Sequence, residues 1–350
     1  MKNSKDKMKK ISIIIAITIT LFIINIFWST GYFRIIENKF EGEIFKKINI
    51  VGAEDITINH IDSFAIISST NRKSFPPKTQ ETGGLYYINL KKIDSEPILL
   101  TKGFKKPFAP HGISIFKKDS ITIIAAVNHT MENEYIEIFK LIGMKLNHVK
   151  TLDNPMISSP NDVVLINENS LYFTNDHKYK DGILRLAEDY LGLPISNVVY
   201  FDGLKFKEVA SGIPFANGIN YDFNKELIFV ASPRKFYIKV FKKNNDNSLS
   251  FIEDIYCGTG VDNIEFDIDN KLWIGAHPNL LHFNSYSKGN NEFAPSEIIS
   301  IKYIEKNNYI KENIYLEKGQ TMSGSTVAAP FGDFILMGNV MDDHFLILRK

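Results

Sequence analysis

The chain has 350 residues, of which 44% are hydrophobic and 23% are charged, and its formal net charge is +1. This balance is typical of a globular protein with a large core, and it excludes the basic surplus of most nucleic-acid-binding proteins. Cys257 is the single cysteine, so an intrachain disulfide and a cysteine-based metal cluster are excluded as well. We therefore expect no nucleic-acid partner, and we expect Cys257 to be a small core residue rather than a nucleophile.

The amino terminus combines positive charge with a long apolar segment. Five lysines in the first ten residues precede the uncharged stretch Ile11–Trp28. As a helix this stretch spans about 27 Å, close to the hydrocarbon thickness of a bilayer, and the flanking lysines orient the rest of the chain away from the cytoplasm. No clear Ala-x-Ala cleavage site follows, so residues 1–30 are predicted to be an uncleaved signal anchor. The remainder is then periplasmic or extracellular, and it is secreted if the segment is cleaved.

After a connector over residues 31–40, residues 41–350 form one predicted domain of short β-type runs separated by Gly, Asn, Asp and Pro. Such a pattern predicts a sandwich, a barrel or a propeller. The one helix-like stretch is Gly182–Leu191. The absence of βαβ alternation and of a glycine-rich phosphate loop argues against a nucleotide-binding α/β fold.

Polar residues recur along this domain with a regular period. Six of them stand just before a β-type run, at intervals of 45 to 61 residues: Glu54, His111, Asn161, Asn217, Asp262 and Ser323. Six units of about fifty residues match the four-stranded blades of a propeller. In a propeller the innermost strand of each blade begins at the central tunnel, so one polar residue per blade can converge on one point. The period therefore favours an all-β six-bladed propeller, although turns recur in every all-β protein.

Three pairs of neighbouring oxygen-bearing residues lie in these positions: Glu54-Asp55, Asn161-Asp162 and Asp262-Asn263. Neighbouring side chains in extended backbone point to opposite faces, so each pair can serve two sites. Carboxylate and amide oxygens, without cysteine or clustered histidine, are the ligands that Ca²⁺ prefers. A single pair of this kind is most often a turn. Three of them suggest two neighbouring calcium sites.

Nine short motifs run through most of the domain: Glu54-Asp55, Pro110–Ser114, Val127–His129, Ser159–Asp162, Thr174–His177, Phe215–Ile219, Val261–Asn263, Gly275–Asn279 and Ser323–Val327. In this order and spacing they resemble the paraoxonase/arylesterase family of calcium-dependent lactonases, which are six-bladed β-propellers. The hydrophobic amino terminus resembles that of the family too. The resemblance implies a central tunnel that contains two Ca²⁺ ions, one catalytic and one structural.

The resemblance also implies a role for each matching residue. The ligands of the catalytic ion, at the tunnel mouth, would be Glu54, Asn161, Asn217, Asp262 and Asn263. The ligands of the buried structural ion would be Asp55, Asp162 and the backbone carbonyl of Ile113. Two carboxylates and three neutral amides leave the catalytic ion with positive charge that can act on a carbonyl oxygen.

Four histidines fall in the matching motifs. His111 and His129 correspond to the family's histidine dyad, in which one imidazole activates water and the second orients the first. From the residues alone, His129 also fits a hydrogen-bonded histidine at a strand end. His277 corresponds to a position in the substrate pocket, and His177 is expected to support the structural-ion side.

The chain departs from the animal members of the family in two places. Those members close the propeller with a disulfide between the chain ends, which the lone Cys257 cannot form. Closure is therefore expected from strand pairing between the run Phe345–Leu348 and an early strand. The loop at residues 70–77 is basic and matches the animal members poorly, so substrate preference does not carry over.

The resemblance implies an enzyme, a carboxylic ester hydrolase that opens lactones and hydrolyses aryl esters. Its partners would be a small lactone or ester and, through residues 1–30, a membrane. The first alternative is a gluconolactonase-type sugar lactonase, against which the His111 and His129 motifs argue. The second is a non-catalytic propeller that binds a partner and uses calcium only for stability. A strictosidine-synthase-like propeller uses no metal, so the oxygen-bearing pairs argue against it.

Overall fold

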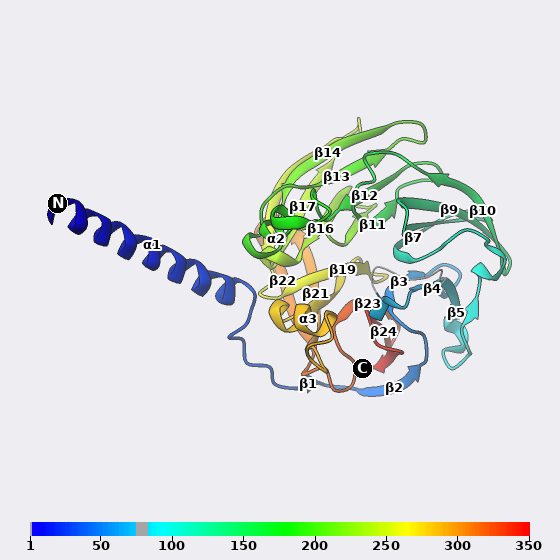
Figure 1. Ribbon diagram of the computed structural model, residues 1–350. Helices are drawn as coiled ribbons and strands as arrows, with labels where there is room; N and C mark the ends of the chain where they lie inside the picture. The colour runs from blue at the N-terminus through cyan, green and yellow to red at the C-terminus, as the bar shows by residue number, and fades with distance from the viewer. Residues whose placement is uncertain (1, 75–82) are drawn as a thin grey trace.

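Six antiparallel sheets surround a central axis in the computed structural model, which describes residues 2–74 and 83–350 (Figure 1). Within these residues, five sheets have four strands and one has five. The innermost strands of neighbouring sheets contact one another around the axis, and they are β3, β7, β11, β15, β19 and β23. The prediction of an all-β six-bladed propeller is confirmed.

The first three blades follow one another in chain order. Blade one contains β3 (Ala53–Asn59), β4 (Phe64–Ser69), β5 (Gly84–Asn89) and β6 (Ile98–Leu99). Blade two contains β7 (Pro110–Lys118), β8 (Ile121–His129), β9 (Glu134–Ile142) and β10 (Lys145–Leu152). Blade three contains β11 (Pro160–Leu165), β12 (Leu171–Asn175), β13 (Ser196–Phe201) and β14 (Phe206–Ile213).

The last three blades complete the circle. Blade four contains β15 (Ile219–Asp222), β16 (Leu227–Ser232), β17 (Tyr237–Lys243) and β18 (Leu249–Tyr256). Blade five contains β19 (Gly260–Phe266), β20 (Leu272–His277), β21 (Ser296–Glu305), β22 (Asn308–Glu317) and the short β1 (Lys39–Phe40). Blade six contains β23 (Ser325–Phe331), β24 (Phe334–Asn339), β25 (Phe345–Arg349) and β2 (Glu43–Ile48).

The hydrophobic core lies between the blades. Strands in the inner half of each blade are buried on both faces, which explains continuous apolar runs such as Ile123–Val127 and Val163–Leu165. One core cluster joins blades two and three through these two runs, and another joins blades six and one. Cys257 lies in a third cluster, is 4% exposed, and burial raises the pKa of its thiol to about 12. It is a core residue, as expected.

The two ends of the propeller domain close the circle by strand pairing. β25 lies between β24 and β2 in blade six, and β2 precedes the first blade in the sequence. Phe345, Leu346, Ile347 and Leu348 are at most 1% exposed. The expected pairing of this run with an early strand is therefore confirmed, and it replaces the covalent closure that the lone cysteine excludes.

Shortening one side chain of the closing strand should destabilise the whole propeller. Ile347 is fully buried between blades, so Ile347→Ala leaves a cavity and should lower the free energy of unfolding by about 2–5 kcal/mol. Ile44 lies in the partner strand β2 but is 48% exposed, so Ile44→Ala should change it by less than about 0.5 kcal/mol. Urea denaturation of both variants in mild detergent measures the difference. Equal effects would show that closure does not depend on this packing.

Helices surround one end of the tunnel. The helix α1 (Lys2–Ser29) extends away from the propeller (Figure 1), and its segment Asp6–Ser29 is long and apolar enough to cross a membrane, with a mean hydropathy of 2.5. Its end contacts the propeller, because the backbone N–H of Leu280 donates to the Thr30 carbonyl at 2.9 Å. The helix α2 (Gly182–Leu191) has the predicted bounds.

A third α-helix in the described residues, α3 (Leu280–Ser287), was not expected from the sequence. Its N-cap is Asn279, whose side chain accepts a hydrogen bond from the backbone N–H of His282. An asparagine after a proline is a helix-start signal, but it is also common in turns. The remaining short segments are the 3-10 helices η1 (Arg72–Ser74), η2 (Leu90–Lys92), η3 (Thr101–Gly103) and η4 (Pro233–Lys235).

Candidate functional site

Five of the six innermost strands carry one extra residue where the sequence places the polar motifs. The register with the neighbouring strand shifts between Ala53 and Asp55, Pro110 and Ile113, Pro160 and Val163, Val261 and Ile264, and Ser325 and Val327. A bulge of this kind re-aims side chains. The bulges therefore interrupt the regular alternation of neighbouring residues at these positions.

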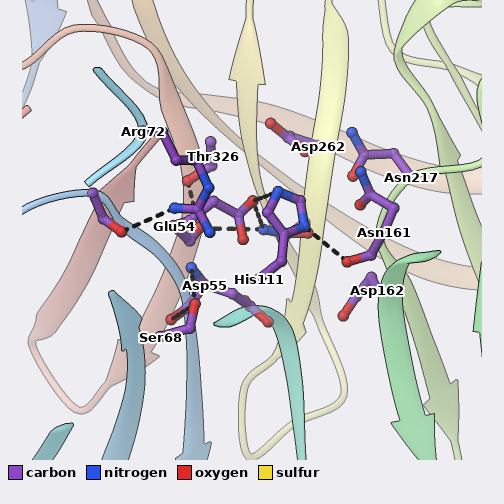
Figure 2. Close-up of polar contacts among 12 residues, drawn as sticks. Glu54, Asp55, Ser68, Arg72, His111, Asn161, Asp162, Asn217, Asp262 and Thr326 are labelled. Atoms are coloured by element: carbon purple, nitrogen blue, oxygen red, sulfur yellow. Dashed lines mark hydrogen bonds and ion pairs between the residues drawn. The ribbon is translucent and has the colours of Figure 1, made fainter. Parts of the chain in front are cut away.

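The proposed ligands of the catalytic ion come together at one end of the tunnel, which we call the tunnel mouth (Figure 2). They come from β3, β11, the turn before β15, and β19, and each is at most 6% exposed; they are Glu54, Asn161, Asn217, Asp262 and Asn263. Asn263 Nδ2 donates to Glu54 Oε1 at 2.9 Å, which joins blades one and five across 209 residues of sequence. The structure thus brings all five together.

Four oxygen atoms of this cluster are buried without a hydrogen-bond partner in the described residues: Glu54 Oε2, Asn161 Oδ1, Asn217 Oδ1 and Asn263 Oδ1. Buried polar atoms are nearly always hydrogen bonded, because an unpaired acceptor loses its hydrogen bonds to water and no protein hydrogen bond offsets that cost. Four unpaired acceptors in one cluster of the described residues fit a cation. The described residues contain no group of three His, Cys, Asp or Glu side chains suited to a metal, so such a cation depends on the amide oxygens.

Burial disfavours the charged form of the carboxyl groups at the tunnel mouth. Burial raises the pKa of Glu54, against the opposing effects of Arg72 and Asn263. Burial also raises the pKa of Asp262, against the hydrogen bond from His277 Nε2 to Asp262 Oδ2 at 2.8 Å. A cation beside a carboxylate favours its charged form. Both groups therefore fit a hard divalent ion.

Arg72 is a buried cation beside this cluster that sequence reasoning missed (Figure 2). Its guanidinium donates to the carbonyl of Gly52 at 3.2 Å and to that of Pro110 at 2.5 Å. Its only sequence signal was the basic loop at residues 70–77, of which residues 75–77 lie outside the described residues. Because its donors are bound to backbone carbonyls, Arg72 acts on Glu54 through charge.

The residues proposed for a structural ion form a second cluster next to the first. Asp55 accepts the backbone N–H groups of Ile56 at 2.9 Å and Ile113 at 2.7 Å, and Asp162 accepts that of Ile219 at 2.7 Å. Burial raises the pKa of both aspartates well above its usual range, and for Asp55 the neighbouring Asp162 adds to the effect. Two neighbouring buried carboxyl groups can both be ionised only beside a counter-charge. They therefore fit a second cation.

Two further residues shape this second cluster. Gly112 packs so closely that a Cβ there would lie 2.4 Å from the Cα of Asp162, so only glycine fits. Glu265 on β19 is 8% exposed, and burial together with Asp55 raises the pKa of its carboxyl well above the usual range. Sequence reasoning missed Glu265, although it follows the pair Asp262-Asn263 by only two residues.

The two histidines of the predicted dyad are in contact. Their ring centroids are 5.0 Å apart, at an interplanar angle of 73°. His111 Nδ1 lies 2.9 Å from the carbonyl oxygen of Asn161, which only accepts, so Nδ1 carries the proton and Nε2 keeps its lone pair. That Nε2 lies 3.7 Å from Glu54 Oε1. Burial, Arg72 and His129 lower the pKa of His111 to about 3, so its imidazole is neutral at pH 7.

A cavity of about 360 Å³ opens at the tunnel mouth between α2 and α3. Its wall contains Leu186 and Phe283 on the helices and Asp262 and His277 on the side of the ligand cluster. His277 stacks on Phe283 with ring centroids 3.8 Å apart, and its Nε2 is held by Asp262. Apolar walls around a few convergent polar groups are typical of small-molecule sites.

Two expectations about individual residues are wrong. His177 does not lie on the structural-ion side: its Nδ1 contacts Asp176, whose Oδ2 accepts from Asn161 Nδ2 at 3.3 Å, so it supports the tunnel mouth. Although burial opposes it, Asp176 raises the pKa of His177 to about 9. In blade six, Ser323 turns its hydroxyl to the Gly319 carbonyl, and Thr326 takes the place by the tunnel, donating to the Glu54 carbonyl.

Comparisons with known proteins find matches over most of the chain. The Arylesterase family model matches residues 33–346. Serum paraoxonase/arylesterase 2 of Gallus gallus is 35% identical over 298 residues, and serum paraoxonase/arylesterase 1 of Homo sapiens is 32% identical over 303; both matches cover 83% of each chain.

Solved structures of distant sequence share the fold. A luciferin-regenerating enzyme has a TM-score of 0.55 at 13% identity, covering 87% of this chain and 92% of its own. A gluconolactonase from Xanthomonas campestris has a TM-score of 0.52 at 9% identity, covering 89% and 94%. At these identities the likeness is one of fold alone. The family model and the curated relatives go further, and the chain belongs to the arylesterase family.

Proposed function

We propose that this protein is a calcium-dependent hydrolase that opens lactones and hydrolyses aryl esters. One observation carries the proposal: four buried, unpaired oxygens from three blades and the segment before β15 converge beside a neutral histidine, and the cavity at the tunnel mouth reaches two of the proposed ligands, Asn217 and Asp262. The paraoxonase/arylesterase relatives support an esterase or lactonase, and the unpaired oxygens beside His111 are the support for a calcium-dependent mechanism.

The tunnel-mouth cluster would hold the catalytic ion through the side-chain oxygens of Glu54, Asn161, Asn217, Asp262 and Asn263. Such an ion, when bound, supplies a Lewis acid for a carbonyl oxygen and for the oxyanion that follows. His277 keeps Asp262 in place by its hydrogen bond. Arg72 favours the ionised form of Glu54 through its charge.

His111 would serve as the general base. The Asn161 carbonyl holds the Nδ1 proton, so the Nε2 lone pair faces the cluster and takes a proton from water as that water attacks the substrate carbonyl. His129 contacts the ring of His111 and would orient it. The apolar side chains of α2 and α3 hold the body of the substrate and exclude other water.

The second ion would be structural, bound by Asp55, Asp162 and the carbonyl of Ile113. Support comes from the burial of both aspartates and the direction of their pKa shifts. The helix α1 would anchor the chain in a membrane with the propeller outside the cytoplasm, or the propeller would be secreted if this segment is cleaved. Calcium is plentiful in that compartment.

Two alternatives differ in their predictions at this site. A gluconolactonase-type enzyme would share the fold and the cation, but the contact between His111 and His129 favours the first assignment. A binding module without catalysis would have no need of a neutral histidine beside four unpaired oxygens.

An assay of the full chain in mild detergent with calcium tests the proposal. Phenyl acetate and aliphatic lactones should both be hydrolysed, with kcat/KM above roughly 10⁴ M⁻¹s⁻¹ for the better class. Gluconolactone hydrolysis without aryl ester hydrolysis would favour the sugar lactonase instead. No hydrolysis of any of the three would favour the binding module.

A further inference from the structure

A glutamate lies directly opposite His129 in the blade-two hairpin. β8 ends at His129 and β9 begins at Glu134, and the two residues are cross-strand partners in the register. The turn between them is held by Thr130, whose hydroxyl donates to the Asn133 carbonyl and accepts the Asn133 N–H. Directly opposed residues have side chains on one face of the sheet. The hairpin itself therefore places the carboxylate beside the imidazole.

The contact between these two side chains is direct. His129 Nδ1 lies 2.5 Å from Glu134 Oε2. An ionised carboxylate only accepts hydrogen bonds, so the Nδ1 of His129 is the donor and its Nε2 is left free. Both side chains are partly exposed, at 18% and 26%, so a purely electrostatic contribution to stability is small. The geometry points to control of the ring rather than to stabilisation of the fold.

His129 has room to turn away from His111. A cavity of about 700 Å³ borders its ring, and the wall of this cavity includes Tyr135 and Glu137. Glu137 is a buried carboxylate nearby, but it is occupied by Asn128 Nδ2, His148 Nε2 and the Thr151 hydroxyl. Among these neighbours Glu134 is the one that holds His129 by its Nδ1.

We propose that Glu134 is a positioning residue for catalysis, which fixes the tautomer and orientation of His129 against His111. The proposal rests on the proposed function, since it gives the histidine pair an orienting carboxylate. His111 is held by the Asn161 carbonyl and His129 by Glu134, each through Nδ1, and the two rings are in contact with their centroids 5.0 Å apart. A carboxylate that orients a histidine is a recurring arrangement in general-base catalysis.

Glu134→Gln tests this in the full chain with calcium, and Glu132→Gln is the matched control because Glu132 is an exposed carboxylate in the same turn. Glu134→Gln should lower kcat for phenyl acetate about 10-fold and leave KM within about twofold, because only the orientation of the catalytic pair changes. Glu132→Gln should leave both constants unchanged. In a His129→Gln background, Glu134→Gln should have no further effect, since its target is gone.

The tautomer of the His129 imidazole can be measured without an activity assay. With ¹⁵N-labelled histidine, the imidazole signals that disappear in His129→Gln identify His129, which should be an Nδ1–H tautomer that loses this preference in Glu134→Gln. Kinetics equal to those of Glu132→Gln, or a full further loss in the His129→Gln background, would overturn the proposal. If the chain hydrolyses no ester or lactone, the proposed function fails, and an unchanged tautomer in Glu134→Gln overturns the inference separately.

Discussion

Adding EGTA to the full chain should abolish hydrolysis of phenyl acetate and of lactones, and it should lower the melting temperature by roughly 5–15 °C. Activity is lost because the oxygens at the tunnel mouth only hold the ion, and without the ion the proposed Lewis acid for the substrate carbonyl is gone. Stability is lost because Asp55 and Asp162 become buried carboxylates without a counter-charge. An ester assay and a thermal melt, with and without chelator, measure both effects.

Restoring the ion provides the control. Added Ca²⁺ should recover both activity and melting temperature, whereas Mg²⁺ should not, because Mg²⁺ demands near-octahedral geometry at about 2.0–2.1 Å and this cluster offers amide and carboxylate oxygens from separate strands. Full activity in excess EGTA, with an unchanged melt, would remove calcium from the mechanism.

Asp262→Asn should lower kcat/KM for phenyl acetate more than about 100-fold, and His129→Gln by about 10-fold or less. The aspartate contributes one of two negative charges in the proposed ligand set and holds His277, so the substitution weakens the ion and disturbs the cavity wall together. His129 acts on the reaction only through His111. Steady-state kinetics at saturating calcium give the ranking.

Asp269 lies in the same blade and is exposed, so Asp269→Asn is the matched control and should leave kcat/KM unchanged. The opposite ranking, in which His129→Gln costs more than Asp262→Asn, would mean that the histidines carry the chemistry and that the ion is structural.

The architecture was predictable because a polar residue stands at or before the start of the innermost strand in five blades, whereas in blade six Thr326 rather than Ser323 lies by the tunnel. The period placed Glu54 and Asp262 at the tunnel, and Glu54 is hydrogen bonded there to Asn263, the neighbour of Asp262 and 209 residues away in the sequence. Closure by Phe345–Leu348 was predictable because a fully apolar terminal run needs a buried partner. The bounds of α2 followed from its local pattern.

Other features depend on tertiary packing that no local pattern carries. The bulges in the innermost strands have no distinctive residue at their extra position: the extra residue is Glu54 in blade one and Thr326 in blade six. Arg72 resembled an ordinary surface cation, and only the fold buries it beside Glu54. Glu134 resembled a solvated charge at a strand end, and its contact with His129 follows from the length of the hairpin turn.

Anomalous diffraction from crystals of the protein grown with calcium shows whether the tunnel-mouth oxygens bind Ca²⁺. We expect a peak about 2.3–2.6 Å from Glu54 Oε2, Asn161 Oδ1, Asn217 Oδ1 and Asn263 Oδ1. A map without a peak there, in which the same four oxygens accept hydrogen bonds from protein groups, would contradict it.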